Sequence, residues 1–341
     1  MRNVLVTGSA GFIGFHLSRL LLQAGWSVTG LDALTDYYDP ALKRRRHALL
    51  TEAGGDRFAA IEGDVATPGL LRDLMGSHRP EAVIHLAAQA GVRHSIDAPG
   101  DYVHANLAGT YELLEAARAH PPAHMLLAST SSVYGGSDDM PYRETQPTDR
   151  PLSFYAATKK ANEAMAHSYA HLYRLPITMF RFFTVYGPWG RPDMALFKFV
   201  AAMRAGRPID VYNHGRMRRD FTYVADLVRG LSGLIDVPPG DAPVSQHDSL
   251  SPDAPFRVVN IGNGEPVELD RFIRAIETAL GQPAERNLMP MQAGDVPATW
   301  AATDLLTDLL GQALPRTPIE DGVARFVEWY LADYEAMRAA L

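Results

Sequence analysis

The stretch Val4-Leu5-Val6-Thr7-Gly8-Ser9-Ala10-Gly11-Phe12-Ile13-Gly14 decides the fold of this chain. A short apolar run with β-branched residues leads into three glycines and then into the periodic apolar segment 15–24, which predicts a strand, a tight turn and a helix. The spacing GxxGxxG is a variant of the dinucleotide-binding fingerprint. We expect Gly8 to permit the turn, Gly11 to let a pyrophosphate approach the backbone, and Gly14 to allow close helix–strand packing.

A carboxylate follows the second predicted strand, residues 27–31, at Asp32. Such a group accepts hydrogen bonds from the adenosine ribose hydroxyls and repels a 2′-phosphate. The sequence therefore favours NAD over NADP as the cofactor. Lys43 and the arginines at 44–46 lie downstream and leave a pairing with phosphate open.

Predicted strands and helices alternate through the first half of the chain. The further predicted strands are residues 58–62, 82–85, 125–128 and 177–182. This alternation predicts the α/β class, with a Rossmann-type doubly wound parallel sheet. We expect an NAD-binding Rossmann domain over 1–180, to which segments near 219–236 and 256–262 return, and a smaller C-terminal α/β substrate-binding domain over 181–341.

Ligands of such a sheet bind at the carboxyl ends of its strands. Asp64 falls at one of these ends and is a candidate partner of the adenine amino group. Ala87 and Ala88 fall at another, where small side chains let a cofactor pass closely. An ordinary loop acid and simple tight packing remain the alternative interpretations.

Composition limits the classes of function. A chain of 341 residues with 47% hydrophobic and 21% charged residues can bury a full core. It has no cysteine, which excludes disulfides and thiol chemistry, and its 12 histidines show no metal-binding pattern, so we expect no metal site. A net charge of −7 does not indicate a nucleic-acid-binding protein, which would carry an excess of basic residues. The absence of a long apolar run predicts no membrane partner and a cytoplasmic protein.

The acid–base chemistry is carried by the segment 128–135, Ala-Ser-Thr-Ser-Ser-Val-Tyr-Gly, and by Tyr155 and Lys159. A helix over 153–175 places the Tyr and the Lys on one face, four residues apart. A phenol ionises near pKa 10, and a neighbouring ammonium lowers that pKa toward the range of a general base. The alternative is that this Tyr and Lys lie four residues apart by chance and have no catalytic role.

Asn106, in a predicted helix over 101–120, is either a polar helix residue or an orienting group.

The second half of the chain has sequence features that favour substrate binding. Residues 181–192 form an aromatic stretch punctuated by Gly and Pro, which predicts a rigid loop facing the substrate. A helix at 195–205 and a strand at 209–213 are predicted to follow. Arg216, Arg218 and Arg219 suit a diphosphate, which guanidinium groups grip with two hydrogen bonds, or they form a solvated turn.

Together these motifs resemble the extended short-chain dehydrogenase/reductase family, and within it the UDP-glucuronate 4-epimerases. The resemblance covers nearly the whole chain. Its most specific stretches are residues 36–39, 85–93, 155–163, 181–197, 210–213 and 290–299.

The resemblance implies a role for each matching residue. Tyr155 is the catalytic base and acid, Lys159 holds the nicotinamide ribose and lowers the pKa of the Tyr, and Thr130 bonds the reacting 4-hydroxyl. The expected cofactor contacts are Gly8, Gly11, Phe12, Ile13, Gly14, Asp32, Lys43, Asp64, Val65, Leu86, Ala87, Ala88, Gln89, Asn106, Ser129, Tyr155, Lys159 and Phe182.

The implied substrate is a UDP-sugar, and the implied assembly is a homodimer through the helices that contain Asn106 and Tyr155. Arg219 and Asp295 match residues that bind the diphosphate and ribose, and Val211 and Tyr212 lie along the uracil. The expected substrate contacts are Arg93, Thr130, Ser131, Ser132, Tyr155, Thr184, Arg191, Val211, Tyr212, Arg219 and Asp295. Related UDP-galactose epimerases have an Arg where this chain has Gln292, so Arg191 or Arg218 is expected to replace that phosphate contact.

The implied reaction is reversible C4 epimerisation of UDP-glucuronate to UDP-galacturonate through a transient 4-keto sugar and bound NAD. The alternatives are a UDP-glucuronate decarboxylase and a non-catalytic NAD-binding regulator. Decarboxylases resemble Thr-Ser-Glu where this chain has Thr130-Ser131-Ser132, and a regulator could lose the Tyr/Lys pair. We expect the hydroxyls of Ser131, Ser132 and Thr184 to hold the sugar carboxylate, with Arg191 or Arg93 balancing its charge, unless they serve only local backbone groups.

Overall fold

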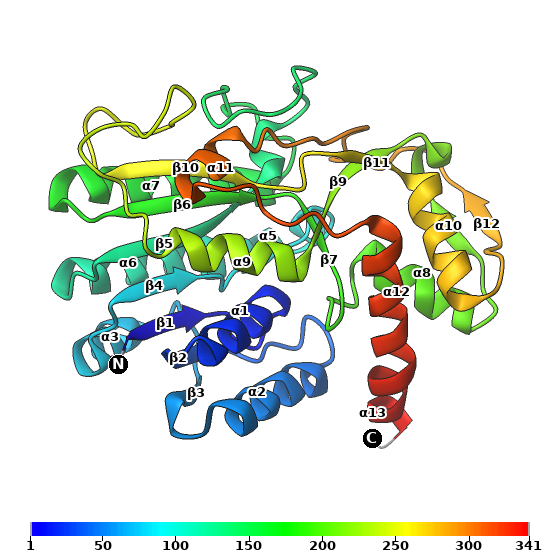
Figure 1. The fold of residues 1–341 in the computed structure, drawn as a ribbon, viewed down its shortest axis with the longest axis horizontal. Helices are drawn as coiled ribbons and strands as arrows, with labels where there is room; N and C mark the ends of the chain where they lie inside the picture. The colour runs from blue at the N-terminus through cyan, green and yellow to red at the C-terminus, as the bar shows by residue number, and fades with distance from the viewer. Residues whose placement is uncertain (1, 340–341) are drawn as a thin grey trace.

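The computed structural model describes residues 2–339, and its centre is a seven-stranded parallel sheet (Figure 1). The strand order is β10-β6-β5-β4-β1-β2-β3. The strands are β1 Asn3–Thr7, β2 Ser27–Asp32, β3 Phe58–Glu62, β4 Ala82–His85, β5 His124–Thr130, β6 Ile177–Phe182 and β10 Phe256–Ile261. The order reverses on either side of β1, which makes the sheet doubly wound, as the sequence predicted.

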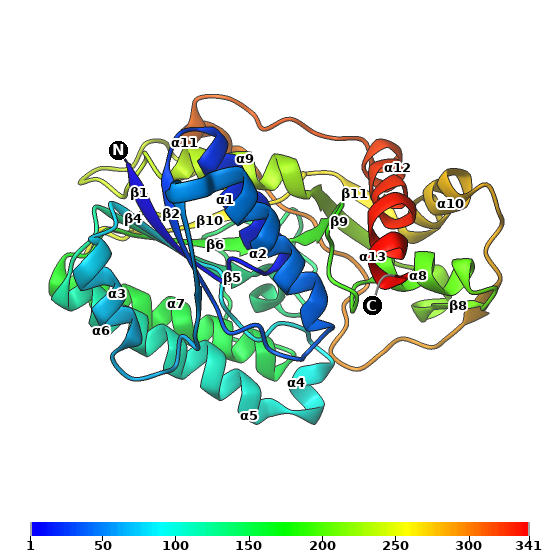
Figure 2. The same cartoon turned by 90° about the horizontal axis from the view of Figure 1, so that it is seen from below.

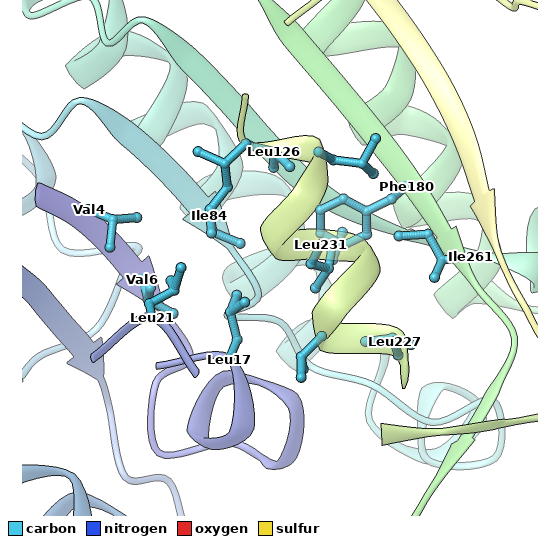
Figure 3. Packing of buried hydrophobic residues seen from close by; sticks show 14 of the residues in the cluster. Val4, Val6, Leu17, Leu21, Ile84, Leu126, Phe180, Leu227, Leu231 and Ile261 are labelled. Carbon is cyan, nitrogen blue, oxygen red and sulfur yellow. The ribbon is translucent and has the colours of Figure 1, made fainter. Parts of the chain in front are cut away.

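Helices cover both faces of this sheet (Figure 2). One face carries α1 Phe12–Gln23, α2 Pro40–Gly54, α9 Val224–Leu234 and α11 Asp304–Leu310. The other carries α3 Leu70–His78, α6 Gly109–Ala119 and α7 Phe154–Tyr173. Leu17, Leu21, Leu227 and Leu231 from α1 and α9 meet Ile84 and its neighbours on the sheet to form the hydrophobic core on the first of these faces (Figure 3). This burial keeps the carboxyl ends of β1, β4 and β5 fixed relative to one another.

A smaller lobe lies beyond those carboxyl ends. It contains the three-stranded sheet β11-β9-β7 and the strand pair β12-β8. Its strands are β7 Thr184–Tyr186, β8 Ile209–Val211, β9 Arg218–Tyr223, β11 Pro266–Glu268 and β12 Arg286–Leu288. Its helices are α8 Ala195–Arg204, α10 Leu269–Leu280, α12 Ile319–Trp329 and α13 Glu335–Ala339. An aromatic core that includes Phe197, Phe272 and Phe326 holds these elements together.

Several predicted elements differ in detail from the structure. The helix predicted over 101–120 is three pieces, α5 Pro99–Tyr102, a π-helical segment Val103–Ala108 and α6, and a short helix α4 His94–Asp97 precedes them. The strand predicted at 209–213 ends at Val211, because Asn213 and His214 have φ values of 49° and 50° in the 3₁₀ segment Tyr212–Gly215. Other 3₁₀ segments are Gly55–Arg57 and Ser131–Tyr134, and a π-helical segment spans Tyr330–Tyr334.

We propose a domain division that follows the packing. The NAD-binding domain then comprises residues 2–180 with α9, β10 and α11, since β10 pairs with β6 and both helices belong to the core of the large sheet. The loop between α9 and β10 belongs to this domain as well, because Asp236 pairs with Arg2 and Ser251 bonds to His167. The other residues from 181 to 339 form the substrate lobe. Over residues 2–339, no helix is both long and apolar enough to cross a bilayer.

Candidate active site

A cleft of about 1380 Å³ opens between the carboxyl ends of β1, β2, β4 and β5 and the smaller lobe. Most of the residues expected from the sequence to contact cofactor or substrate line this cleft. The exceptions are Asn106, Val211 and two members of the arginine cluster, Arg216 and Arg218. Among residues 2–339, no cluster of His, Asp or Glu could hold a metal ion.

The glycine turn forms the floor of the cleft at the start of α1. Gly8 has a φ of 72°, and a Cβ there would lie 2.7 Å from the backbone nitrogen of Ala87. A Cβ on Gly14 would clash with the carbonyl oxygen of Gly8, and one on Gly11 would lie 2.9 Å from the same oxygen. The first turn of α1 therefore packs directly on the loop after β1, and its free N–H groups face the cleft where a pyrophosphate would bind.

Asp32, at the end of β2, is fixed beneath this turn. Its carboxylate accepts hydrogen bonds from the N–H of Ala10 at 3.0 Å and of Leu34 at 2.9 Å. Lys43 directs its ammonium to Thr35, with 2.7 Å to the carbonyl oxygen and 2.8 Å to the hydroxyl. Arg46 is fully buried and donates to the carbonyl oxygens of Ala10 and Trp189. The residues present fit NAD. Asp32 lies where the adenosine ribose would bind, and Lys43 and Arg46 already have hydrogen-bond partners within the protein, so neither is left to bind a 2′-phosphate.

Tyr155 and Lys159 enter the cleft from the first two turns of α7. The helix begins after Ser153, whose hydroxyl accepts a hydrogen bond from the N–H of Ala156 at 3.1 Å. Lys159 donates from Nζ to the carbonyl oxygen of Ala128 at 2.9 Å, which ties α7 to the end of β5. Thr130 ends β5 and lines the cleft together with Tyr155.

The structure corrects one expectation about these two residues. Burial raises the pKa of Tyr155 above 10, and the groups that lower it are the hydroxyl of Thr130 and the charge of Arg191, not Lys159. The reason is that the Lys159 ammonium is directed at Ala128 and is itself buried, which lowers its pKa to about 8.

A buried ion pair that the sequence analysis missed supports this end of the site. Glu163, two turns after Tyr155, accepts two hydrogen bonds of 2.9 Å from Arg181 and one of 2.6 Å from the hydroxyl of Ser129. Both charged side chains are almost fully buried. The pair fixes α7 against β5 and β6 next to Thr130. The spacing of Tyr155, Lys159 and Glu163 at intervals of four residues was the available signal.

The far end of the cleft carries positive charge around one acid. Asp295 lies 3.6 Å from Arg219 and 3.8 Å from Arg93, and the guanidinium of Arg93 lies 4.6 Å from the ring centroid of Tyr212. Arg218, in contrast, is exposed, lies outside the cleft and pairs with Glu268. The expectation that Arg218 replaces the contact missing at Gln292 is therefore wrong, because β9 alternates and only Arg219 faces inward.

A second group missed by the sequence analysis is Asp193. It accepts two hydrogen bonds from Arg191, at 3.0 and 2.6 Å, and a third of 3.3 Å from the hydroxyl of Tyr37. Arg191 also reaches the carbonyl oxygen of Ala90 at 3.4 Å. The charge of Arg191 is thus already balanced within the cleft.

Asn106 and Val211, which also lie outside the cleft, have structural roles. Asn106 lies in the π-helical segment, where its amide bonds both the N–H and the carbonyl oxygen of Gln89 and the hydroxyl of Thr158. It therefore positions Gln89, which does line the cleft. Val211 is buried in the aromatic core of the smaller lobe, and its neighbour Tyr212 faces the cleft instead.

Comparison with known proteins assigns this arrangement to a family. A sequence model of the NAD dependent epimerase/dehydratase family matches residues 4–243. The chain belongs to this family. It is 54% identical over 334 residues, 97% of each chain, to a probable UDP-glucuronate 4-epimerase of Rhizobium meliloti (strain 1021). It is also 44% identical over 342 residues, 99% of this chain and 77% of the other, to UDP-glucuronate 4-epimerase 4 of Arabidopsis thaliana.

A solved structure of this NAD-dependent family shares the whole architecture. It is the UDP-glucuronic acid 4-epimerase from Bacillus cereus in complex with UDP-glucuronic acid and NAD, with a TM-score of 0.85 and 30% identity. The match covers 99% of this chain and 100% of that one. The predicted fold class and the resemblance to the 4-epimerases are confirmed by these comparisons.

Proposed function

We propose that this chain catalyses the reversible C4 epimerisation of UDP-glucuronate to UDP-galacturonate with NAD as its cofactor. The observation that carries the proposal is that one cleft joins the glycine turn, the group of Thr130, Tyr155 and Lys159, and the cationic end at Arg219. The strong similarity to UDP-glucuronate 4-epimerases along nearly the full chain supports the same reaction.

Separate groups of residues bind the cofactor, transfer the proton and hold the UDP group in this proposal. The turn from Gly8 to Gly14 and Asp32 would hold NAD, which when bound takes a hydride from C4 of the sugar and returns it to the opposite face. Tyr155 takes the proton of the 4-hydroxyl and later returns one, while Thr130 holds that hydroxyl in line. Arg219 and Asp295 hold the UDP group, whose binding energy keeps the transient 4-keto sugar in the site while the ring turns over.

The substrate carboxylate needs separate control, because a 4-keto sugar acid is a β-keto acid that loses CO₂ when its C5–C6 bond lies parallel to the carbonyl π system. We propose that Ser131, Ser132 and Thr184, which all line the cleft, hold the carboxylate away from that alignment. Since Arg191 is already paired with Asp193, neutral hydroxyls are left to fix the orientation.

The two alternative functions have less support. A decarboxylase would use an acid beside Thr130, where this chain has Ser131 and Ser132. A non-catalytic regulator would not need Tyr155 and Lys159 in the cleft. The deciding experiment incubates the purified protein with UDP-glucuronate and separates epimer, pentose and starting sugar by chromatography with mass detection. We expect UDP-galacturonate without added reductant, and UDP-pentose as the main product would show a decarboxylase instead.

Thr184→Val is expected to raise the ratio of UDP-pentose to UDP-galacturonate, because it removes one hydroxyl that orients the carboxylate with almost no change in volume. The products are quantified by the same chromatography, with bound NAD measured by absorbance. Thr184→Ser keeps the hydroxyl and serves as the control with the parent product ratio. A variant that slows uniformly, with no more pentose than the parent, would rule out the carboxylate role.

We also propose a cytoplasmic location and a homodimer through the helical segment that contains Asn106 and continues into α6, and through α7, which contains Tyr155. The exposed fractions of Tyr111, Leu172 and Tyr173 on these helices are 49%, 64% and 40%. Large apolar side chains gathered on neighbouring helices favour a protein interface. Light scattering is expected to give twice the mass of the chain, and Leu172→Glu is expected to shift it to that of a monomer. A parent protein that scatters as a monomer at micromolar concentration would contradict the dimer.

A further inference from the structure

A strap of residues 293–302 forms the outer wall of the cleft at its cationic end. Its cleft-lining residues are Ala293, Gly294, Asp295, Val296 and Thr299. The strap has little regular structure of its own and runs beside β9, where the N–H of Arg218 donates to Pro297 at 3.0 Å and the N–H of Asp220 donates to Thr299 at 3.0 Å. The position of Asp295 therefore depends on the contacts that hold the strap on the side away from the cleft.

Asp220, immediately after the cleft residue Arg219, faces away from the cleft and is fully buried. Its carboxylate accepts hydrogen bonds from the N–H of Asn263 at 2.7 Å and of Gly264 at 2.9 Å, in the turn after β10. It also accepts one of 3.1 Å from the N–H of Ala301 in the strap. One carboxylate thus joins three segments: β9, the turn after the edge strand of the cofactor sheet, and the strap.

Among residues 2–339, no cation forms an ion pair with Asp220 that would explain its burial. The groups that stabilise its ionised form are backbone N–H groups and the hydroxyl of Thr222, whereas burial raises its pKa to about 6. The junction is also tight, because a Cβ on Gly262 would lie 2.5 Å from the Ala301 side chain and 3.0 Å from the Asp220 carboxylate. A buried carboxylate without a cation is costly, so its three N–H contacts indicate a requirement for position.

We propose that Asp220 is a positioning residue for UDP binding: it fixes the strap, and with it Asp295 and Arg219, against the cofactor sheet. This inference rests on the proposed function, since it assigns the strap to the UDP end of the substrate. Asp220 lies outside the cleft and acts through the two residues that face it.

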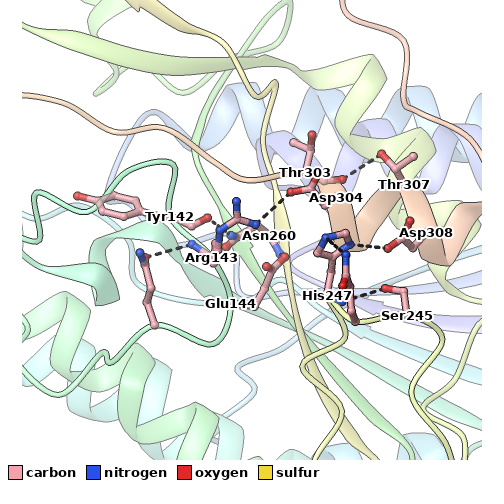
Figure 4. A network of polar contacts seen from close by, with 12 residues as sticks. Tyr142, Arg143, Glu144, Ser245, His247, Asn260, Thr303, Asp304, Thr307 and Asp308 are labelled. Atoms are coloured by element: carbon pink, nitrogen blue, oxygen red, sulfur yellow. Dashed lines mark hydrogen bonds and ion pairs between the residues drawn. The ribbon is translucent and has the colours of Figure 1, made fainter.

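A second set of contacts holds the strap to the same sheet. Tyr142 donates from its N–H to the carbonyl oxygen of Trp300 at 2.7 Å and accepts from the N–H of Ala302 at 2.9 Å. The carbonyl oxygen of Tyr142 also accepts a hydrogen bond of 2.8 Å from the side chain of Asn260 in β10 (Figure 4). In addition, the indole of Trp300 donates to the carbonyl oxygen of Gly264 at 3.0 Å. Two sets of hydrogen bonds therefore hold the strap at the end of β10: those of Tyr142 and Trp300, and those of the Asp220 carboxylate.

Asp220→Asn tests the proposal, because the side chain keeps its size while its NH₂ group cannot accept a hydrogen bond. At least one of the three backbone N–H groups then loses its acceptor. We expect the Kd for UDP, measured by calorimetry on the NAD-loaded protein, and the KM for UDP-glucuronate to rise at least roughly tenfold. We expect bound NAD to be unchanged and kcat at saturation to stay within about threefold, because the chemistry end is untouched.

Two further variants keep the test decisive. Trp300→Phe removes only the indole tie to Gly264, so it should weaken UDP binding in the same way by a smaller factor, even if Asp220→Asn does not fold. Asp248→Asn alters another buried acid, paired with Arg257 away from the cleft, and should lower stability without changing UDP affinity. Parent-like UDP affinity in the Asp220 and Trp300 variants would overturn the proposal. A parent protein that does not bind UDP would overturn the proposed function itself.

Discussion

Tyr155→Phe is expected to lower kcat for UDP-glucuronate epimerisation by at least about 100-fold, within the usual range for loss of a general acid–base group. The substitution removes the only ionisable group of a side chain that lines the cleft together with Thr130, and it otherwise keeps the shape of that side chain. KM and bound NAD should change little, since the ring still fills its place beside Lys159. Steady-state rates of UDP-galacturonate formation measure the effect.

Tyr102→Phe is the matched control for this change. Tyr102 packs edge-on against Tyr155 with ring centroids 6.0 Å apart, but its hydroxyl donates to the carbonyl oxygen of Gly91 and its side chain does not line the cleft. Loss of that hydroxyl should leave kcat far closer to the parent value. Near-normal turnover in Tyr155→Phe would instead assign the base to another residue.

Gly14→Ala is expected to abolish retention of NAD and, with it, activity. The added Cβ would clash with the carbonyl oxygen of Gly8 and come within 2.9 Å of the Cα of Ser9, so α1 must move away from the turn that binds the pyrophosphate. Overpacking of this kind costs about 1–3 kcal/mol in the free energy of unfolding. The NAD content of the purified protein and its thermal denaturation report both effects.

Gly100→Ala is the corresponding control, because a Cβ at Gly100 meets no atom within 4 Å. That variant should retain NAD and the stability of the parent. A Gly14→Ala protein that keeps stoichiometric NAD would mean that the close contact of α1 with the turn does not shape the cofactor site.

The sequence by itself determined the cofactor half of the molecule. The strand, glycine turn and helix from Val4 onward are encoded within a short segment, and the predicted strands 58–62, 82–85 and 177–182 have the same bounds in the structure. Buried parallel strands read as short apolar runs, and a turn that needs positive φ selects Gly8. Tyr155 and Lys159 were found for the same reason, since their spacing within one helix is a local signal.

Only the tertiary structure decided how the substrate half is assembled. Arg218 and Arg219 are equivalent in a sequence motif, but the alternation of β9 sends one outward to Glu268 and the other inward to Asp295. Asn106 looked like a cleft residue, yet the π-helical segment directs it to Gln89 and Thr158. Tyr37 meets Asp193 across 156 positions of the chain.

The same reason explains the strap and Asp220. A carboxylate in a strand carries no local sign that it will accept N–H groups from a turn 43 residues away and from a strap 81 residues away. Such contacts form because the apolar cores bring β9, β10 and the strap together, and the backbone groups buried there must then find partners. Local propensity and periodicity thus specified which helices and strands form and where the cofactor binds. Long-range packing decided which polar side chains meet in the cleft and which hold its walls from the buried side.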